Sequence, residues 1–364
     1  MKNIGLYLHI PFCRSKCPYC DFYSLKADES VKEQYVNVLK NRITAEMSAL
    51  SCKVDTLYIG GGTPSVLGAE KLGEIVKTAL PFLSENAEIT VECNPFGLSE
   101  AFFKTLAFYG VNRISMGLQS ANDSERRALG RLSDSETVKK AVLSAQNAGI
   151  KNISLDVMLG IPRQTEKSLS ETLDFCVSLG VPHISAYILK LEEGTVFYNR
   201  QNSFSLPDDD AVADLYLQTC ETLEQNGIMQ YEISNFAKSG YESRHNLKYW
   251  NCEEYLGLGP AAHSFLGGKR FYFERDIARF LNSAKPIQDG NGGDFTEYAM
   301  LRLRLCDGLL NSETERRFGH KIPEEMIKKS AVFADNGFME SDETGIRLTR
   351  NGFLLSNSIL AEIL

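Results

Sequence analysis

The chain has 364 residues, of which 43% are hydrophobic and 24% charged, and its formal net charge is -8. This composition is that of an ordinary globular protein, and the length predicts one large domain plus a smaller one. The negative charge argues against general attraction to phosphate backbones or anionic lipid. No apolar run in the sequence is long enough to cross a bilayer, so we expect any membrane contact to be peripheral.

The cysteines indicate the cellular compartment. There are nine, an odd number, and beyond the first three they are scattered singly. The initial methionine is followed by a predicted strand rather than by a basic and apolar leader. Both observations favour a cytoplasmic location over secretion.

An apolar strand followed by an amphipathic helix recurs through the first two-thirds of the chain. Strands are predicted at 6–11, 56–59, 89–92, 113–117, 153–158 and 183–189. Helices are predicted at 30–50, 68–83, 99–109, 134–148, 165–179 and 208–226. This alternation implies a parallel sheet with right-handed crossovers, either open or curled into a partial barrel. In both arrangements the functional residues are expected at the carboxyl ends of the strands.

The pattern changes after residue 231. One more strand-like segment covers 231–236, and the stretch 240–290 is rich in glycine and aromatic residues. Further on, helices are predicted at 295–306, 311–318 and 323–336, a hairpin near 343–345, and a last helix at 350–364. We therefore predict a core domain, a connector and a C-terminal domain, with the bounds 1–237, 238–290 and 291–364.

Three helices followed by a hairpin are similar to a winged-helix module, which raises the hypothesis of a nucleic-acid binder that uses a metal cluster as a redox sensor. From residue 291 onward, however, nine Lys and Arg face twelve Asp and Glu. Nucleic-acid binding needs a basic surface first. We therefore predict no nucleic-acid partner.

Three cysteines with C-x3-C-x2-C spacing, Cys13, Cys17 and Cys20, follow the first predicted strand. Thiolates are the preferred ligands of iron–sulfur clusters, and three of them leave one iron of a four-iron cluster open. A structural zinc site is the alternative, but it requires a fourth ligand, for which His9 and Asp21 are the nearby candidates. The spacing therefore favours the cluster.

Polar or glycine residues stand near the ends of the next strands. The sequence GGGTP at 60–64 lets the backbone approach a ligand and offer its N–H groups, with a simple tight turn as the alternative. Glu92, Gln119 and Asp156 lie in or at the ends of three successive strands, where a polar side chain is costly to bury unless it is paired. Arg131 follows a glycine in a loop, where it could bind a carboxylate or remain solvated.

These motifs resemble those of the radical S-adenosylmethionine superfamily, and the longer strings resemble its coproporphyrinogen-oxidase-like branch. The strings are YLHIPFC from Tyr7, RISMGLQ from Arg113 and LDVMLGIP from Leu155. The resemblance implies a partial (β/α)6 barrel with a small C-terminal helical, winged-helix-like domain. It also implies that the three cysteines hold a 4Fe–4S cluster whose open iron chelates S-adenosylmethionine. By position, the implied S-adenosylmethionine contacts are Tyr7, Gly61, Gly62, Thr63, Glu92, Gln119, Arg131 and Asp156.

Two groups within this branch compete. Anaerobic coproporphyrinogen oxidases carry a further cysteine two residues after the third, where this chain has Phe22. They also have an N-terminal extension before the first strand, whereas Tyr7 already lies in that strand here. Both departures argue against oxygen-independent decarboxylation of coproporphyrinogen III, which is kept as the alternative function.

The segment HNLKYW at 245–250 resembles the H-N-x-x-Y-W sequence of haem chaperones in the same branch. The resemblance implies haem as cargo, with His245 able to ligate the iron and Tyr249 and Trp250 forming a flat apolar wall. A loop histidine held by packed aromatic residues is the alternative. His263 is a second candidate contact, for which packing is the more expected role.

The predicted function is therefore that of a haem chaperone, which binds haem and transfers it to acceptor proteins. Membrane-associated proteins are among the candidate acceptors. A monomer and a homodimer are both compatible with the sequence.

Overall fold

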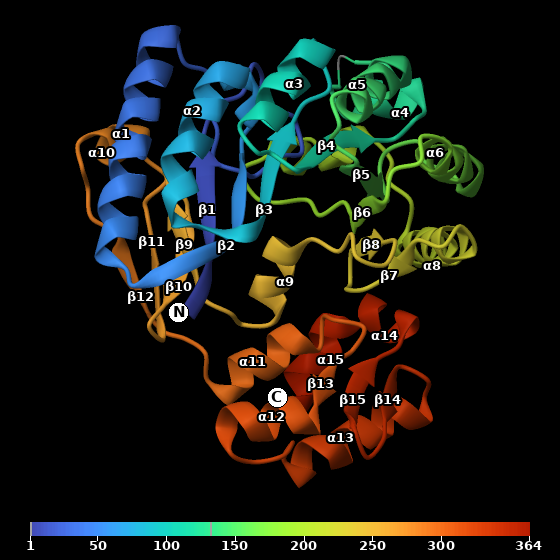
Figure 1. Ribbon diagram of the computed structural model, residues 1–364. Coiled ribbons are helices and arrows are strands. Elements are labelled where there is room, and N and C mark those ends of the chain that lie inside the picture. Colours follow the sequence, from blue (N-terminus) through green and yellow to red (C-terminus); the bar gives the residue numbers. More distant parts are fainter. Residues whose placement is uncertain (1, 132) are drawn as a thin grey trace.

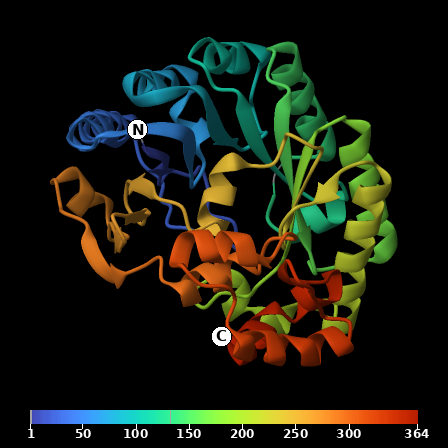
Figure 2. The same cartoon turned by 60° about the horizontal axis from the view of Figure 1, so that its bottom comes forward.

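The computed structural model describes residues 2–131 and 133–364, and its centre is a curved sheet of 12 strands (Figure 1). The strand order is β12-β11-β10-β9-β1-β2-β3-β4-β5-β6-β8-β7. Strands β1 to β6 are parallel neighbours, and most of the helices of the first two-thirds of the chain lie on the convex side of the sheet (Figures 1 and 2). The predicted partial barrel is confirmed.

All six predicted parallel strands are present. Their bounds are β1 Lys2–Ile10, β2 Cys52–Gly61, β3 Leu83–Cys93, β4 Arg113–Gln119, β5 Asn152–Leu159 and β6 His183–Ile188. The first three begin four to six residues earlier than predicted, because their amino ends carry polar residues that the apolar pattern does not mark. Glu85 and Asn86, for example, belong to β3 and are exposed.

The helices between these strands are also present. They are α1 Glu29–Ala49, α2 Ala69–Ala79, α3 Glu100–Phe108, α5 Ser135–Asn147, α6 Glu166–Ser178 and α8 Asp209–Gln225. The predicted helix at 68–83 is too long: α2 ends at Ala79 and a 3-10 turn follows, because Pro81 has no N–H to continue the helix. The short helices α4 Asp123–Ala128 and α7 Val196–Asn199 were not predicted.

Helix starts follow ordinary capping chemistry. In five of the six helices just described, a side-chain oxygen of the capping residue accepts a hydrogen bond from an N–H group of the first turn, and the caps are Asp28, Ser99, Asp134, Thr165 and Asp208. Each helix then buries an apolar face against the sheet, as α1 does with Leu39, Ile43 and Met47.

The two faces of the parallel sheet differ in chemistry. Paired residues on neighbouring strands share a face, and successive residues alternate between faces. One row across four strands faces the barrel interior: Tyr7, Tyr58, Thr90 and Arg113. The next row is apolar and faces the helices: Leu8, Ile59, Val91 and Ile114. The interior of this barrel is therefore largely polar and aromatic.

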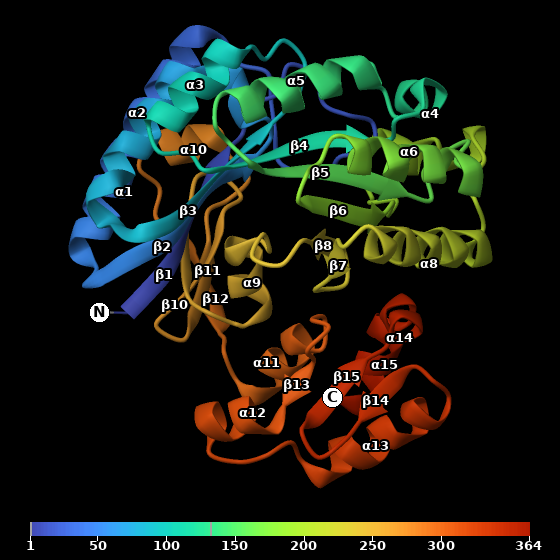
Figure 3. The same cartoon turned by 45° about the vertical axis from the view of Figure 1, so that its right-hand side comes forward.

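Residues 229–291 continue the sheet at both edges. Beyond β6 lie β8 Asn235–Ala237 and β7 Met229–Gln230, and beyond β1 lie β9 Tyr255–Leu258, β10 His263–Leu266, β11 Lys269–Tyr272 and β12 Ile287–Asn291. Helix α9 Arg244–Trp250 crosses between the two edges (Figures 1 and 3), and α10 Ile277–Leu281 packs beside α1. The strands β9 to β12 were not predicted, because they are short and interrupted by glycines.

The C-terminal part forms a separate layer below the barrel (Figures 1 and 3). Its helices are α11 Phe295–Arg302, α12 Asn311–Phe318, α13 Glu324–Asp335, α14 Arg350–Leu354 and α15 Ser356–Ile363. A three-stranded sheet accompanies them, with β13 Leu309–Leu310, β15 Gly345–Leu348 and β14 Met339–Ser341. The helices and the hairpin follow the winged-helix-like prediction, except that the last helix is divided at Leu355. None of the described helices is both long and apolar enough to cross a membrane.

Candidate functional site

A cavity of about 260 Å³ opens at the carboxyl ends of the parallel strands. It brings together ten of the residues predicted for the cluster and for S-adenosylmethionine: Cys13, Cys17, Cys20, Gly61, Gly62, Thr63, Glu92, Gln119, Arg131 and Asp156. Tyr7 is not among the residues that line the cavity. It lies on the inward face of β1, two residues before His9, and its hydroxyl is 3.0 Å from Nδ1 of His9. The topology thus gathers residues that are up to 143 positions apart in the sequence (13 to 156).

The loop after β1 presents the three cysteines to this cavity. Two backbone hydrogen bonds close its base, from Cys13 N to Leu25 O (3.0 Å) and from Leu25 N to Pro11 O (2.9 Å). A third, from Cys20 N to Cys17 O (3.1 Å), makes the turn that separates the last two thiols. The three thiols are unbonded to one another and half-buried. The loop is thus held by its backbone, which leaves the sulfur atoms available as ligands.

The arrangement of these thiols fits a cluster better than zinc. Among the described residues, no three metal-ligating side chains converge on a point where they could hold one ion. A zinc site needs four converging ligands, whereas a cubane cluster takes each thiolate at a different iron. The two candidate fourth ligands have other partners: Nε2 of His9 is hydrogen-bonded to Tyr23 O (3.0 Å), and Asp21 pairs with Arg275 (3.2 Å).

The glycine turn after β2 packs against the cysteine loop. Gly62 N donates to Ile10 O (2.9 Å) and Thr63 N to Phe12 O (2.8 Å). A side chain at Gly61, whose φ is +113°, would come within 2.6 Å of the His9 ring. The glycines are therefore required by close packing within the protein, in addition to any approach to a ligand.

Two half-buried carboxyl groups face the cavity. Glu92 accepts hydrogen bonds from Tyr58 Oη (2.8 Å) and Gly61 N (3.0 Å), and Asp156 accepts one from Ser115 Oγ (3.2 Å). Burial raises the pKa of Glu92 to about 7, and the charge of Asp156 contributes. Burial likewise raises the pKa of Asp156 to about 6. An incoming cationic group would ionise both carboxyls, so the pair is suited to bind an amino group or another cation.

Gln119 and Arg131 form the far wall of the cavity. Gln119 has a φ of +71°, a strained value for a residue with a side chain, and its Oε1 accepts a hydrogen bond from Tyr187 Oη (3.0 Å). The Arg131 guanidinium donates to Tyr19 Oη from Nη2 (2.6 Å) and Nε (3.1 Å). Since Tyr19 belongs to the cysteine loop, Arg131 holds that loop from the side opposite the glycine turn.

Several residues of the site were missed from the sequence. Ser115, Tyr187 and Tyr19 line the cavity, and Tyr58 supports Glu92 from below. Strand alternation is a signal that could have found two of them, because Tyr58 stands two positions before Gly60 and Ser115 two before Gly117 on the inward face. Tyr187 and Tyr19 carry no such local signal.

Helix α9 lies at the opposite end of the barrel interior, away from the cysteines. His245, which is 1% exposed, is hydrogen-bonded through Nδ1 to Thr56 Oγ1 and through Nε2 to Tyr249 Oη, each at 2.8 Å. Its ring stacks on Tyr58 with the centroids 5.2 Å apart. Burial, with a contribution from the charge of Lys248, lowers the pKa of His245 to about 3, so the ring is neutral near pH 7.

The position of α9 is fixed by charges as well. The Glu88 carboxylate accepts hydrogen bonds from the first N–H groups of the helix, Arg244 N (3.0 Å) and His245 N (3.1 Å). Lys248 forms an ion pair with Asp55 (2.9 Å). The helix therefore closes the lower end of the barrel, and the structure does not bring His245, Tyr249 or Trp250 to the cysteine cavity. His263, by contrast, is exposed on β10.

Comparison with known proteins shows which proteins this chain resembles. Residues 7–176 match the Radical SAM superfamily model and residues 295–355 match the HemN C-terminal domain. The heme chaperone HemW of Escherichia coli (strain K12) is 39% identical, with 99% of this chain and 98% of the relative aligned. The heme chaperone HemW of Bacillus subtilis (strain 168) is 33% identical, with 98% of each chain aligned.

Among solved structures, the coproporphyrinogen III oxidase HemN from Escherichia coli, a radical SAM enzyme, superposes with a TM-score of 0.85. The match covers 100% of this chain and 90% of that one at 23% identity. At this identity the likeness shows that the fold is shared.

Proposed function

We propose that this chain, which belongs to the HemW family of radical S-adenosylmethionine proteins, binds haem and transfers it to acceptor proteins. One observation carries the proposal: the likeness to relatives named heme chaperones runs along the whole chain, at up to 39% identity. It therefore includes both the barrel and the C-terminal domain. Phe22, which stands where the oxidases have another thiol, lines the cavity and is 67% exposed.

The cavity supports the cofactors that are general in this superfamily, a 4Fe–4S cluster and S-adenosylmethionine. The three cysteines would hold the cluster, and Glu92 and Asp156 would hold the amino group and the sugar hydroxyls of the nucleotide-like ligand. When bound, the cluster and S-adenosylmethionine together supply one-electron chemistry. The protein itself contributes the thiol ligands of the loop after β1, and a pair of half-buried carboxyls and the strained Gln119 on rigid strands.

The predicted haem contact of His245 requires a movement of α9. Both ring nitrogens have protein partners in the described conformation, and iron ligation would have to replace one of them. Tyr249 is one of those partners, so it would have to move as well. The arrangement supports a different role for His245, which is to anchor α9 inside the barrel.

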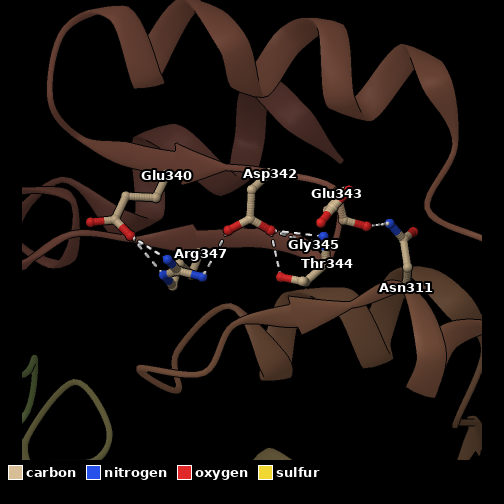
Figure 4. Close-up of polar contacts among 7 residues, drawn as sticks. All are labelled: Asn311, Glu340, Asp342, Glu343, Thr344, Gly345 and Arg347. Atoms are coloured by element: carbon tan, nitrogen blue, oxygen red, sulfur yellow. Dashed lines mark hydrogen bonds and ion pairs between the residues drawn. The ribbon is translucent and has the colours of Figure 1, made fainter.

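The hairpin of the C-terminal domain supports a function without nucleic acid (Figure 4). Arg347 is paired with Glu340 (2.7 Å) and Asp342 (3.4 Å), and Asp342 also accepts hydrogen bonds from the turn at Thr344 and Gly345. A phosphate-binding wing needs unpaired basic side chains. Here the carboxylates neutralise the arginine.

Haem transfer is the experiment that tests this proposal. The anaerobic protein is titrated with haem and then mixed with an apo-acceptor haemoprotein, with and without the cluster. We expect the Soret band of the acceptor to appear at the expense of that of the chain. A second reaction contains coproporphyrinogen III, a reductant and S-adenosylmethionine. Clean conversion to protoporphyrinogen there would overturn the proposal in favour of the oxidase.

A further inference from the structure

The histidines of the chain differ in whether their ring nitrogens are available. There are five, and both ring nitrogens of His9, His183 and His245 are hydrogen-bonded within the buried interior. The other two, His263 and His320, are exposed. An imidazole ligates iron through a free nitrogen lone pair, so a haem that approaches from solvent can reach only these two rings.

His263 lies on the face of the sheet that continues the barrel interior. Gly257 of β9 pairs with Tyr7, which faces inward. Tyr255, two residues earlier on β9, shares that face and pairs with Phe265 of β10. His263 is two residues before Phe265, so it faces inward too. Phe265 is buried on this face, whereas His263, at the start of β10, is exposed.

A row of two flat rings and one apolar side chain begins at His263 and crosses two more strands. His263 pairs with Tyr272 of β11, and Tyr272 pairs with Ile287 of β12. The rings of His263 and Tyr272 are stacked, with centroids 5.2 Å apart and an interplanar angle of 23°. Ile287 is 38% exposed, on an edge strand that is exposed throughout. We call these three residues the inner row.

The inner row is joined to the cysteine loop. Arg275 pairs with Asp21 (3.2 Å), and Ile277 N donates to Tyr23 Oη (3.0 Å). Both contacts come from the segment that directly follows β11. The inner row therefore lies on β10, β11 and β12, which are separated from β1 by β9 (Figure 1), and the segment after β11 connects it to the loop that carries the three cysteines.

We propose, on the premise of the proposed haem function, that His263 is an axial ligand of the haem iron. An imidazole coordinates with its plane upright on the porphyrin, so the macrocycle would lie across the exposed edges of the stacked His263 and Tyr272 rings. Tyr272 would then contact the porphyrin edge-to-face, and Ile287 would cover part of the same face.

The charge around the ring suits this ligand. Partial burial lowers the pKa of His263. The Asp289 carboxylate opposes this shift, and the positive charges of Arg275 and Arg270 add to it. The ring is therefore neutral near pH 7, so it can donate its lone pair without releasing a proton.

His320 is the competing exposed histidine. It follows α12 in a turn of the C-terminal domain, where its Nδ1 is hydrogen-bonded to Lys321 O (2.8 Å) and its ring packs edge-on against Phe295 (centroids 5.2 Å apart). It stands on a turn, whereas His263 is held in strand β10. A site carried by a strand is more rigid.

The test is a haem titration of the full-length protein and of the variants His263→Ala and His320→Ala, followed by the Soret band and by resonance Raman detection of the iron–histidine stretch. We expect His263→Ala to lose the iron–histidine band and to bind haem at least about tenfold more weakly, a loss of about 1.4 kcal/mol. Free imidazole should restore the band in that variant. His320→Ala should match the wild type.

The outcomes separate the two proposals. Haem binding with an unchanged iron–histidine band in His263→Ala, or loss of the band in His320→Ala instead, would overturn the assignment of His263 and leave the haem function standing. Absence of haem binding by the wild type would overturn the haem function itself. His263→Met is a second variant that keeps a ligand, and a Soret band shifted from that of the wild type supports the assignment.

Discussion

The two ends of the barrel interior hold similar residues for different purposes. At the carboxyl ends, Glu92 and Asp156 are half-buried with raised pKa values, beside three half-buried thiols and a cavity. At the lower end, Glu88 and His245 are fully buried: Glu88 accepts hydrogen bonds from the first N–H groups of α9, and His245 bonds Thr56 of β2 and Tyr249 of α9. A polar residue that faces a cavity thus indicates a binding site. A polar residue that is fully enclosed by its protein partners instead holds elements of the structure together.

The largest effect is expected at the cysteine end. Cys17→Ser removes one of three cluster ligands, so we expect the visible absorbance of the cluster and its iron and sulfide content to be lost. Cys52→Ser is the matched control, because Cys52 lies at the start of β2, outside the cavity lining, and should leave all three signals intact. Metal analysis that finds one zinc and no sulfide in the wild type would show that the site is not a cluster.

The next effect is expected at the lower end. His245→Ala leaves Thr56 and Tyr249 without their buried partner and opens a cavity, which should cost about 2–4 kcal/mol of unfolding free energy. Urea denaturation measures this, with His320→Ala, on an exposed turn, expected to change it by less than about 0.5 kcal/mol. Full stability of His245→Ala together with lost haem binding would reverse the interpretation and place His245 in the haem site.

A pH-dependent effect distinguishes the carboxyls of the cavity. The pKa of Glu92 is raised from 4.5 to about 7 in the folded protein, so the folded state binds more protons than the unfolded state between these values. Stability should therefore be complete below pH 4.5 as far as this group is concerned, and should fall as the pH rises through 7.

Glu92→Gln removes this dependence. At pH 8 we expect the variant to be more stable than the wild type by about 1–3 kcal/mol, while it binds S-adenosylmethionine more weakly. Denaturation at pH 5 and pH 8 checks the first claim and calorimetry the second. Glu85→Gln, on an exposed part of β3, is the control. A variant that is less stable at both pH values would show that Glu92 stabilises the folded structure, as Glu88 does.

The smallest effect is expected at Tyr58, which contacts residues from both ends of the barrel interior. Its ring stacks on His245 and its hydroxyl donates to Glu92. Tyr58→Phe keeps the stacking but removes the hydrogen bond, which should cost about 0.5–1.5 kcal/mol at pH 8 and raise the pKa of Glu92 further. The pH of half-maximal S-adenosylmethionine binding should move upward accordingly. A change in haem binding instead would link the two ends functionally.

Local patterns in the sequence were sufficient for most of the barrel. Alternating apolar residues marked the six parallel strands, and their order placed the cysteines, Glu92 and Asp156 at one end. The buried position of His245 could not be predicted in this way, because its partners Thr56 and Glu88 are more than 150 positions away in the sequence. The hydrogen bond from Arg131 to Tyr19 could not be predicted either, because it joins two loops that no periodicity connects.

The outer edges of the barrel have consequences for folding during synthesis. Strand β1 obtains one of its two neighbours, β9, only after about 250 more residues have been made, and the cysteine loop obtains its contacts with Arg275 and Ile277 later still. Until then an edge of β1 stays unpaired and the loop lacks the partners of Asp21 and Tyr23. Stable cluster loading should therefore follow completion of β11 on the ribosome, and chains truncated before that point should bind iron weakly and aggregate readily.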